Sequence, residues 1–280
     1  MITLKNRFLT VEIATKGAEL QSVRDADGAE RLWQGDAKYW TGRAPIMFPV
    51  CGGLKDDLYR LDGQEYTMPK HGYVRQLEWE VESAEAEKAV FLMKEKHDGF
   101  PFDYELRMCY ELADNSIRIS ASVKNLDSRT FVYGIGSHEA YATPGGLEAC
   151  TVVFEKKEDL KDHVLHGNLI ERGAVILGKD TDRLPMKTEY FAVDALVFPE
   201  QESRSVTLEN SFSGKKIRVD YQGLDVLMLW TKPGAGYLCI EPWSNAPDYL
   251  DADQDIRHKP GMITLEPGQE ATRTHTITVM

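Results

Sequence analysis

The chain has 280 residues, of which 42% are hydrophobic and 28% are charged, so it can bury a core without disulfides or a structural metal. Its formal net charge of −12 argues against nucleic acid and anionic membranes as partners, because both need a basic surface. No apolar segment is long enough to span a bilayer, and the N-terminal MITLKNRFLTVEI lacks the apolar core of a signal peptide. We therefore expect a cytoplasmic protein.

Short alternating segments dominate the chain. Residues 107–123 show the pattern most clearly, because two alternating runs flank Asp114-Asn115-Ser116, which is typical of a β-hairpin. The other predicted strands are residues 88–95, 204–208, 215–221, 224–231, 237–240 and 272–279. Short helices are expected only at 36–40 and 155–163. This pattern, without any linker, predicts an all-β, antiparallel sandwich or barrel that forms a single domain over residues 1–280.

Four cysteines are scattered along the chain with no CxxC pair, at Cys51, Cys109, Cys150 and Cys239. Most lie in apolar surroundings, so we expect reduced, buried side chains that act as small hydrophobic groups. None has the paired spacing of a metal-ligand set.

Five segments combine a titratable side chain with residues typical of turns or strand ends. They are RAPIMFPVCGGL (43–54) with Arg43, PKHGYVR (69–75) with His71, GIGSHEAY (134–141) with His138, FAVDALVF (191–198) with Asp194, and CIEPWSNAPD (239–248) with Glu241 and Trp243.

The last of these segments places an acid inside an apolar sequence. Pro242 biases Glu241 towards an extended conformation, so its carboxylate can be aimed and partly desolvated, which raises its pKa towards that of a general base. Glycine beside His71 and His138 allows close approach of a ligand, and imidazole suits proton transfer near neutral pH. A carboxylate base and a histidine acid can move a proton across a small polyol, and Trp243 suits the apolar face of a sugar ring.

Other interpretations remain open from the residues alone. Each side chain could be structural, and His71, His138 and Glu241 could form a His₂Glu zinc site, although no HExxH spacing is present. Ser137 or Ser244 could belong to a Ser-His-acid triad, although no GxSxG occurs. The absence of GxGxxG and GxxxxGK[ST] leaves a nucleotide cofactor unsupported.

At these segments the sequence resembles the aldose 1-epimerase (galactose mutarotase-like) family, most closely its LacX-like branch. The matching stretches cover nearly the whole chain in family order: RAPIMFPVCGGLKDDLYRLDGQEYTMPKHGYVR, GIGSHEAYATP, FAVDALVF, YLCIEPWSNAPD and KPGMITLEPGQEATRTHTITV. The resemblance implies a β-supersandwich with a cleft for a monosaccharide and no cofactor. We expect a monomer or homodimer.

The resemblance also implies roles for individual residues. Glu241 corresponds to the general base, His138 to the general acid, and His71 to a histidine that helps to bind and polarise the ring oxygen. Arg43 and Asp194 correspond to substrate-binding residues. The implied reaction is mutarotation: the ring opens, the C1–C2 bond rotates, and closure from the other face gives the other anomer.

This sequence departs from the branch at two places. Glu139 follows His138 where proline is common, so its carboxylate either raises the pKa of His138 or points to the opposite face of the strand. The segment 244–247 also differs, and it could change substrate choice. The alternatives are a sugar-binding protein without turnover and a hexose-phosphate mutarotase. The candidate phosphate-binding cations are Arg43, Lys55, Arg60, Lys70 and Arg75.

Overall fold

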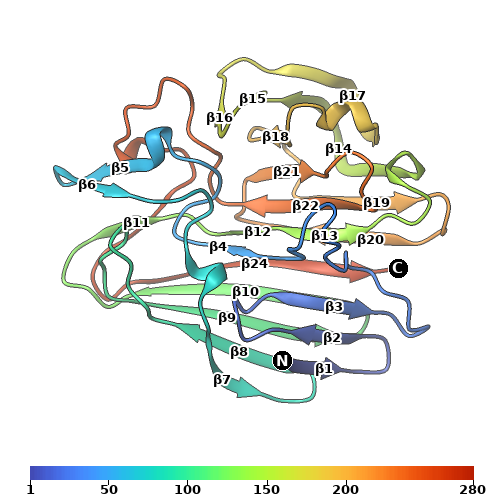
Figure 1. Cartoon of the computed structure of the whole chain (residues 1–280), viewed down its shortest axis with the longest axis horizontal. Helices are drawn as coiled ribbons and strands as arrows, with labels where there is room; N and C mark the ends of the chain where they lie inside the picture. Colours follow the sequence, from blue (N-terminus) through green and yellow to red (C-terminus); the bar gives the residue numbers. More distant parts are fainter.

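The computed structural model describes residues 1–280, and its largest element is a nine-stranded antiparallel sheet (Figure 1). Its strand order is β17-β14-β19-β20-β24-β10-β9-β8-β7. The bounds are β7 (Glu80–Ala84), β8 (Lys88–Met93), β9 (Tyr104–Ala113), β10 (Ser116–Asn125), β14 (Cys150–Asp162), β17 (Val175–Pro185), β19 (Ser205–Asn210), β20 (Lys216–Asp220) and β24 (Glu270–Val279).

A second antiparallel sheet carries most of the predicted chemistry. Its order is β18-β21-β22-β12-β4, and β13 also pairs with β22. The bounds are β4 (Ile46–Met47), β12 (Gly136–Ser137), β13 (Glu139–Ala142), β18 (Leu196–Phe198), β21 (Val226–Trp230) and β22 (Tyr237–Trp243).

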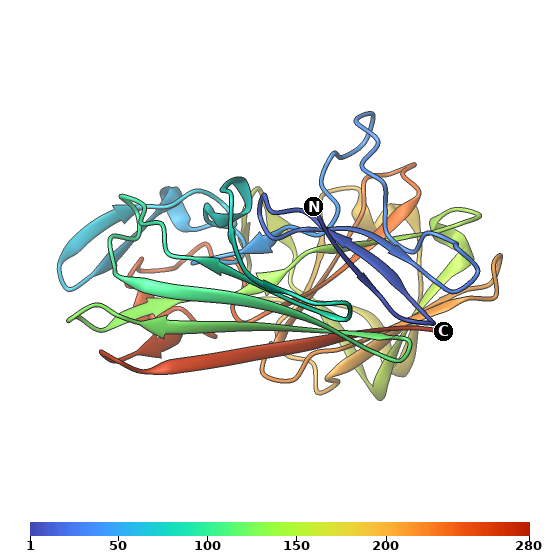
Figure 2. The same ribbon diagram turned by 90° about the horizontal axis from the view of Figure 1, so that it is seen from below.

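Smaller sheets complete the architecture. The N-terminal strands β1 (Ile2–Lys5), β2 (Thr10–Ile13) and β3 (Leu20–Arg24) form a three-stranded sheet, seen beside the long strands in Figure 2. The two-stranded sheets are β5 (Leu58–Leu61) with β6 (Gln64–Thr67), β11 (Phe131–Tyr133) with β23 (Ile263–Leu265), and β15 (Leu165–His166) with β16 (Leu169–Ile170).

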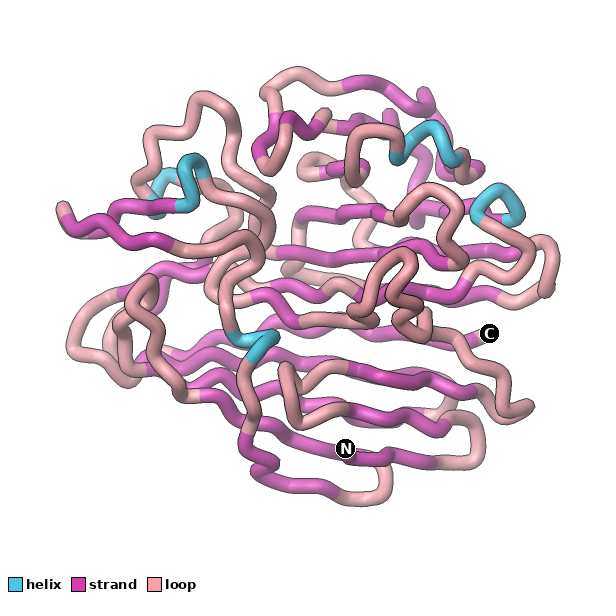
Figure 3. Tube along the Cα trace, viewed as in Figure 1, coloured by secondary structure: helices cyan, strands magenta, loops and turns pink.

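Helical structure is limited to five short 3₁₀ turns (Figure 3), so the all-β prediction with few short helices is confirmed. They are Lys55–Asp57, Val74–Gln76, Leu147–Ala149, Thr188–Phe191 and Ile256–His258.

The hairpin predicted at 107–123 is confirmed as β9 and β10. Alternate residues of β9 are buried because the strand presents one face to the core. The chain reverses at Asp114, whose φ of 51° lies in the left-handed region that aspartate tolerates. The Tyr110 hydroxyl, on the buried face, donates to the Ala18 carbonyl at 2.6 Å and so ties the N-terminal sheet to the large one.

Both predicted helices were wrong. Residues 155–163 lie largely in β14, where pairing with β17 outweighs the weak local preference of a charged segment. Residues 36–40 form a turn in which the amides of Tyr39 and Trp40 donate to the Asp36 carbonyl. In the segment 191–198, which carries Asp194, only Leu196–Phe198 forms a strand, and it pairs with β21.

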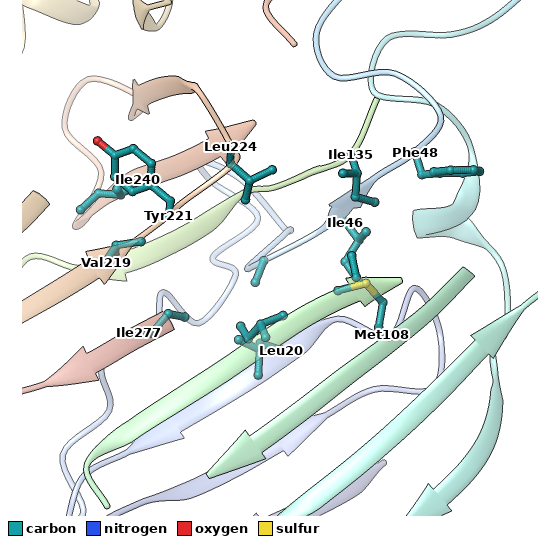
Figure 4. Close-up of a cluster of buried hydrophobic side chains, with 14 of the residues drawn as sticks. Leu20, Ile46, Phe48, Met108, Ile135, Val219, Tyr221, Leu224, Ile240 and Ile277 are labelled. Atoms are coloured by element: carbon teal, nitrogen blue, oxygen red, sulfur yellow. The ribbon is translucent and has the colours of Figure 1, made fainter. Parts of the chain in front are cut away.

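The main core fills the space between the two larger sheets. Buried aliphatic side chains meet there, among them Ile240 of β22, Ile277 of β24 and Ile135 before β12 (Figure 4). This layer forms the rigid base of the strands that carry the site.

Candidate active site

Glu241 lies in β22, a strand in which every residue is buried. β22 pairs with β21 on one side, where Glu241 faces Met228, and with β13 on the other, where Ile240 faces Glu139. This double pairing fixes the backbone, and only 1% of Glu241 is exposed. The prediction of an aimed, desolvated carboxylate therefore matches its position.

A cavity of about 850 Å³ opens in front of this strand, within the range of roughly 300–1,000 Å³ that is usual for small-molecule sites. Five of the six predicted site residues line it: His71, His138, Asp194, Glu241 and Trp243. They come from segments separated by up to 172 positions, so the fold brings them together. A smaller cavity of about 220 Å³ along residues 247–260 contains none of them.

His138 and Glu241 form the centre of the cavity. The Nε2 atom of His138 lies 3.4 Å from Oε2 of Glu241, and both side chains are almost fully buried. His138 Nδ1 and Glu241 Oε2 have no hydrogen-bond partner in the protein. Buried polar atoms are normally paired, so unpaired ones at a cavity mark a place where ligand oxygens can bind.

Burial shifts the pKa values of this pair in opposite directions. It raises the pKa of the Glu241 carboxyl well above its usual value, and the nearby Lys70 opposes this rise. It lowers the pKa of the His138 imidazole to about 3. Both shifts favour the uncharged forms, a protonated Glu241 carboxyl and a neutral His138 imidazole. In this state the pair holds one titratable proton, which lies on the carboxyl. A pair that holds one proton can accept a proton from one ligand oxygen and donate one to another.

His71 supplies a second imidazole at the cavity. Its Nδ1 accepts a hydrogen bond from the Gly52 amide at 3.1 Å, so its Nε2–H can donate to a ligand. Burial lowers the pKa of His71 well below its usual value, so the ring is neutral at physiological pH. The rings of His71 and His138 are 5.9 Å apart.

The backbone around His71 explains the glycine that follows it. His71 has a φ of 68°, and Gly72 has a φ of 69°. A Cβ atom on Gly72 would lie 1.9 Å from the Phe48 carbonyl oxygen. Glycine is therefore required for this close approach, which presents His71 to the cavity.

Tryptophan side chains enclose the two histidines. Trp243 packs edge-on against His71 at 5.3 Å between ring centroids, and its Nε1–H donates to the Ser137 carbonyl at 3.1 Å. The ring of Trp40 lies 4.9 Å from that of His138. Trp40 was not among the residues predicted from the sequence, where its only local signal is an aromatic residue in a loop before Gly42.

The structure corrects the prediction for Arg43, which does not line the cavity. Its guanidinium donates to the Gln34 carbonyl at 3.0 Å and to the Gln21 side chain, so these contacts hold it beside the N-terminal sheet. Asp194 does line the cavity, and its Oδ1 accepts from the Ala195 amide at 2.9 Å.

Glu139 points away from the cavity. Its carboxylate binds Ser137 and His275 on the opposite face of the strand, as expected for neighbours that alternate. Of the two alternatives for Glu139, the structure therefore shows the one in which it points to the opposite face, and burial lowers the pKa of His138.

Neither the His₂Glu zinc site nor the Ser-His-acid triad is formed from the residues considered for it. The three side chains whose ligand atoms lie within 4.8 Å of one another are His138, Cys239 and Glu241, without His71. Burial raises the pKa of the Cys239 thiol well above its usual value, which disfavours the thiolate. Ser137 donates to Glu139, and Ser244 accepts from the Ile135 amide, so neither serine is paired with a cavity histidine.

Comparison with known proteins places this geometry in context. The family model described as aldose 1-epimerase matches residues 1–278. Protein LacX (chromosomal) of Lactococcus lactis subsp. lactis is 33% identical, over all of this chain and 99% of its own length.

Two solved structures share the fold closely. The galactose mutarotase related enzyme from Lactobacillus acidophilus is 29% identical, covers 99% of this chain and 96% of its own, and has a TM-score of 0.92. A galactose mutarotase-like protein from Lactobacillus casei is 26% identical over 100% of both chains, with a TM-score of 0.94.

Fold and cavity together define a galactose mutarotase-like β protein with a buried carboxylate–imidazole pair. The chain belongs to the aldose 1-epimerase family. No helix in it is both long and apolar enough to cross a membrane.

Proposed function

We propose that this protein is an aldose 1-epimerase that interconverts the α and β anomers of a free aldohexose by general acid–base catalysis. The observation that carries the proposal is the contact of 3.4 Å between His138 and Glu241, which both line one cavity and each have a buried polar atom without a partner in the protein. The family, and the names of the related structures, support the same class of reaction.

In the proposed mechanism, Glu241 is the base and His138 is the acid. Glu241 removes the proton of the anomeric hydroxyl while His138 protonates the ring oxygen, so the C1–O5 bond breaks and an open-chain aldehyde forms. Rotation about C1–C2 and the reverse proton transfers close the ring from the other face. His71 donates its Nε2–H to the ring oxygen or a hydroxyl, and Asp194 accepts from sugar hydroxyls.

This mechanism requires the shared proton to lie on His138 when the sugar is bound. The Lys70 ammonium lowers the pKa of Glu241, and hydrogen bonds from sugar hydroxyls to the carboxylate lower it further. Sugar binding therefore shifts the pair towards the imidazolium–carboxylate form, while the number of protons on the pair stays the same.

Polarimetry tests this proposal directly. Fresh α-anomers of glucose and galactose are expected to reach the same equilibrium rotation as in buffer, but faster and in proportion to protein concentration. Equal rates with and without protein for all common aldoses would reject mutarotase activity. Binding by calorimetry at unchanged rates would instead favour a sugar-binding protein without turnover.

A second candidate is the mutarotation of a hexose phosphate, and the charge of the cavity favours it. The cavity is lined by four cations, and none of them forms an ion pair: Lys38, Lys70, Arg75 and Lys232. Only two carboxylates, Asp194 and Glu241, line it. A locally cationic cavity in a chain of net charge −12 suits an anionic sugar.

Of the five cations predicted to bind a phosphate, only Lys70 and Arg75 line this cavity. Replacing Lys70 or Arg75 by methionine is expected to raise KM for a hexose phosphate about 10- to 100-fold, because a charge-assisted hydrogen bond is lost. The KM for the free hexose would change less than about threefold. Kinetics with both sugars, and the exposed Lys157→Met as a control, decide between the two substrate classes. Equal effects on both sugars would reject a phosphate-binding role.

A further inference from the structure

A polar cluster lies buried in the layer between the two larger sheets, behind the cavity. It consists of Ser137, Glu139 and His275, which are 5%, 2% and 4% exposed. The surrounding layer is apolar, as the positions of Ile135, Ile240 and Ile277 show (Figure 4). Burying a carboxylate there is costly unless it is paired, so the cluster needs a reason beyond packing.

Both oxygens of the Glu139 carboxylate are bound, one by a residue of the opposite sheet and the other by a residue of its own sheet. Oε1 is 2.9 Å from Nε2 of His275, which comes from β24 of the nine-stranded sheet. Oε2 accepts a hydrogen bond from Ser137 Oγ at 2.8 Å. Because each oxygen has its own partner, the orientation of the side chain is fixed.

The residues of this cluster flank His138. Strand β12 ends at Ser137 and β13 begins at Glu139, so His138 lies between the two strands. The Ser137 carbonyl also accepts the Nε1–H of Trp243, which packs against His71. Fixing Ser137 and Glu139 therefore fixes the backbone on both sides of His138 and one wall of the cavity.

We propose that Glu139 and His275 form a positioning pair, which holds His138 at proton-transfer distance from Glu241. The inference rests on the proposed acid–base function. Neither residue lines the cavity, so they act through His138 and Trp243 and do not touch the sugar.

The charge of Glu139 also affects the pKa of the proposed base, Glu241. The titratable groups around Glu241 are His138, Cys239, Lys70, Asp194 and, from behind, Glu139, whose charge raises the pKa of Glu241. Those that face Glu139 are His275 and the hydroxyls of two buried tyrosines, while Arg273 lies beside His275 at a small cavity. Removing the charge of Glu139 lowers the pKa of Glu241 and so favours its carboxylate form.

Two substitutions separate geometry from charge. Glu139→Leu removes both contacts and is expected to lower kcat about 10- to 100-fold, because small misplacements of catalytic groups have effects of this size. Glu139→Gln keeps both contacts, since its amide oxygen accepts from Ser137 and its NH₂ donates to His275. It is expected to keep kcat within about threefold, while the acidic limb of the pH–kcat/KM profile moves to lower pH.

A matched control is the exposed pair of His166 and Glu171, which also has a distance of 2.9 Å between Nε2 and Oε1. Glu171→Gln is expected to leave kcat and the pH profile unchanged. If Glu139→Leu does not fold, His275→Leu and the milder Ser137→Ala take its place in the test. His275→Gln is the conservative variant of His275→Leu and is expected to restore kcat.

Nuclear magnetic resonance keeps this test independent of turnover. The imidazole ¹⁵N signals of His138 and the indole N–H signal of Trp243 are expected to shift in folded Glu139→Leu and to stay unchanged in Glu171→Gln. If the wild-type protein shows no turnover, the proposed function is rejected, and the positioning pair is still tested by the NMR signals. Unchanged His138 and Trp243 signals, or a folded Glu139→Leu variant with wild-type kcat, reject the positioning pair.

Discussion

Replacing Glu241 by glutamine is expected to lower kcat for mutarotation about 10²- to 10⁴-fold, the usual contribution of a general base. Glutamine has the same shape but accepts no proton at neutral pH. Because only 1% of Glu241 is exposed, water has little access to replace the base. Polarimetry at saturating sugar measures kcat, and KM is expected to change little because the amide oxygen still accepts a hydrogen bond.

The contrasting variant is Asp194→Asn, which lies in the same cavity. Asp194 is partly exposed and is proposed only to accept sugar hydroxyls, so its replacement is expected to raise KM several-fold and leave kcat within about threefold. Retention of kcat within tenfold by Glu241→Gln would place the base elsewhere. A Glu241→Gln variant that loses sugar binding by calorimetry would instead make Glu241 a binding residue.

The sequence alone predicted those features that depend on local order. The hairpin at 107–123 follows from alternation and a turn, both of which are properties of neighbouring residues. The orientation of Glu241 was predictable for the same reason, because Pro242 and an apolar strand restrict it from both sides. The resemblance to the family then suggested that His71, His138 and Glu241 meet, which local patterns cannot establish.

Contacts between distant segments explain what could not be predicted. Arg43 precedes a cavity-forming segment, yet Gln21 and Gln34 bind its guanidinium away from the cavity. The direction of Glu139 depends on His275, 136 positions further along the chain. Lys70 and Arg75 were only two of five candidate cations, and their place at the cavity follows from the loop around His71.

The buried ion pair of Lys259 and Asp248 leads to the largest expected effect on stability. Lys259 Nζ lies 2.6 Å from Asp248 Oδ1, and the two side chains are 5% and 6% exposed. Burial lowers the pKa of Lys259, which reflects the cost of removing its charge from water. Lys259→Met is expected to reduce the free energy of unfolding by about 3–5 kcal/mol, because it leaves the Asp248 carboxylate buried without its cation.

The double variant Lys259→Met/Asp248→Asn tests whether the unpaired charge is the cause. Asp248 Oδ2 also accepts from the Lys55 amide at 2.9 Å, and the asparagine oxygen can keep this bond without a charge. The double variant is therefore expected to lose only about 1–2 kcal/mol. Urea unfolding measures these free energies if several probes give coincident transitions.

An exposed pair provides the control for burial. Arg60 and Glu65 are 3.3 Å apart with side chains 50% and 56% exposed, so Arg60→Met is expected to change the free energy of unfolding by only about 0–1 kcal/mol. If Lys259→Met costs no more than Arg60→Met, water reaches the Lys259–Asp248 pair. The neighbouring residue Pro247 lines the active-site cavity, so this result would also mean that the cavity wall is less rigid than its contacts imply.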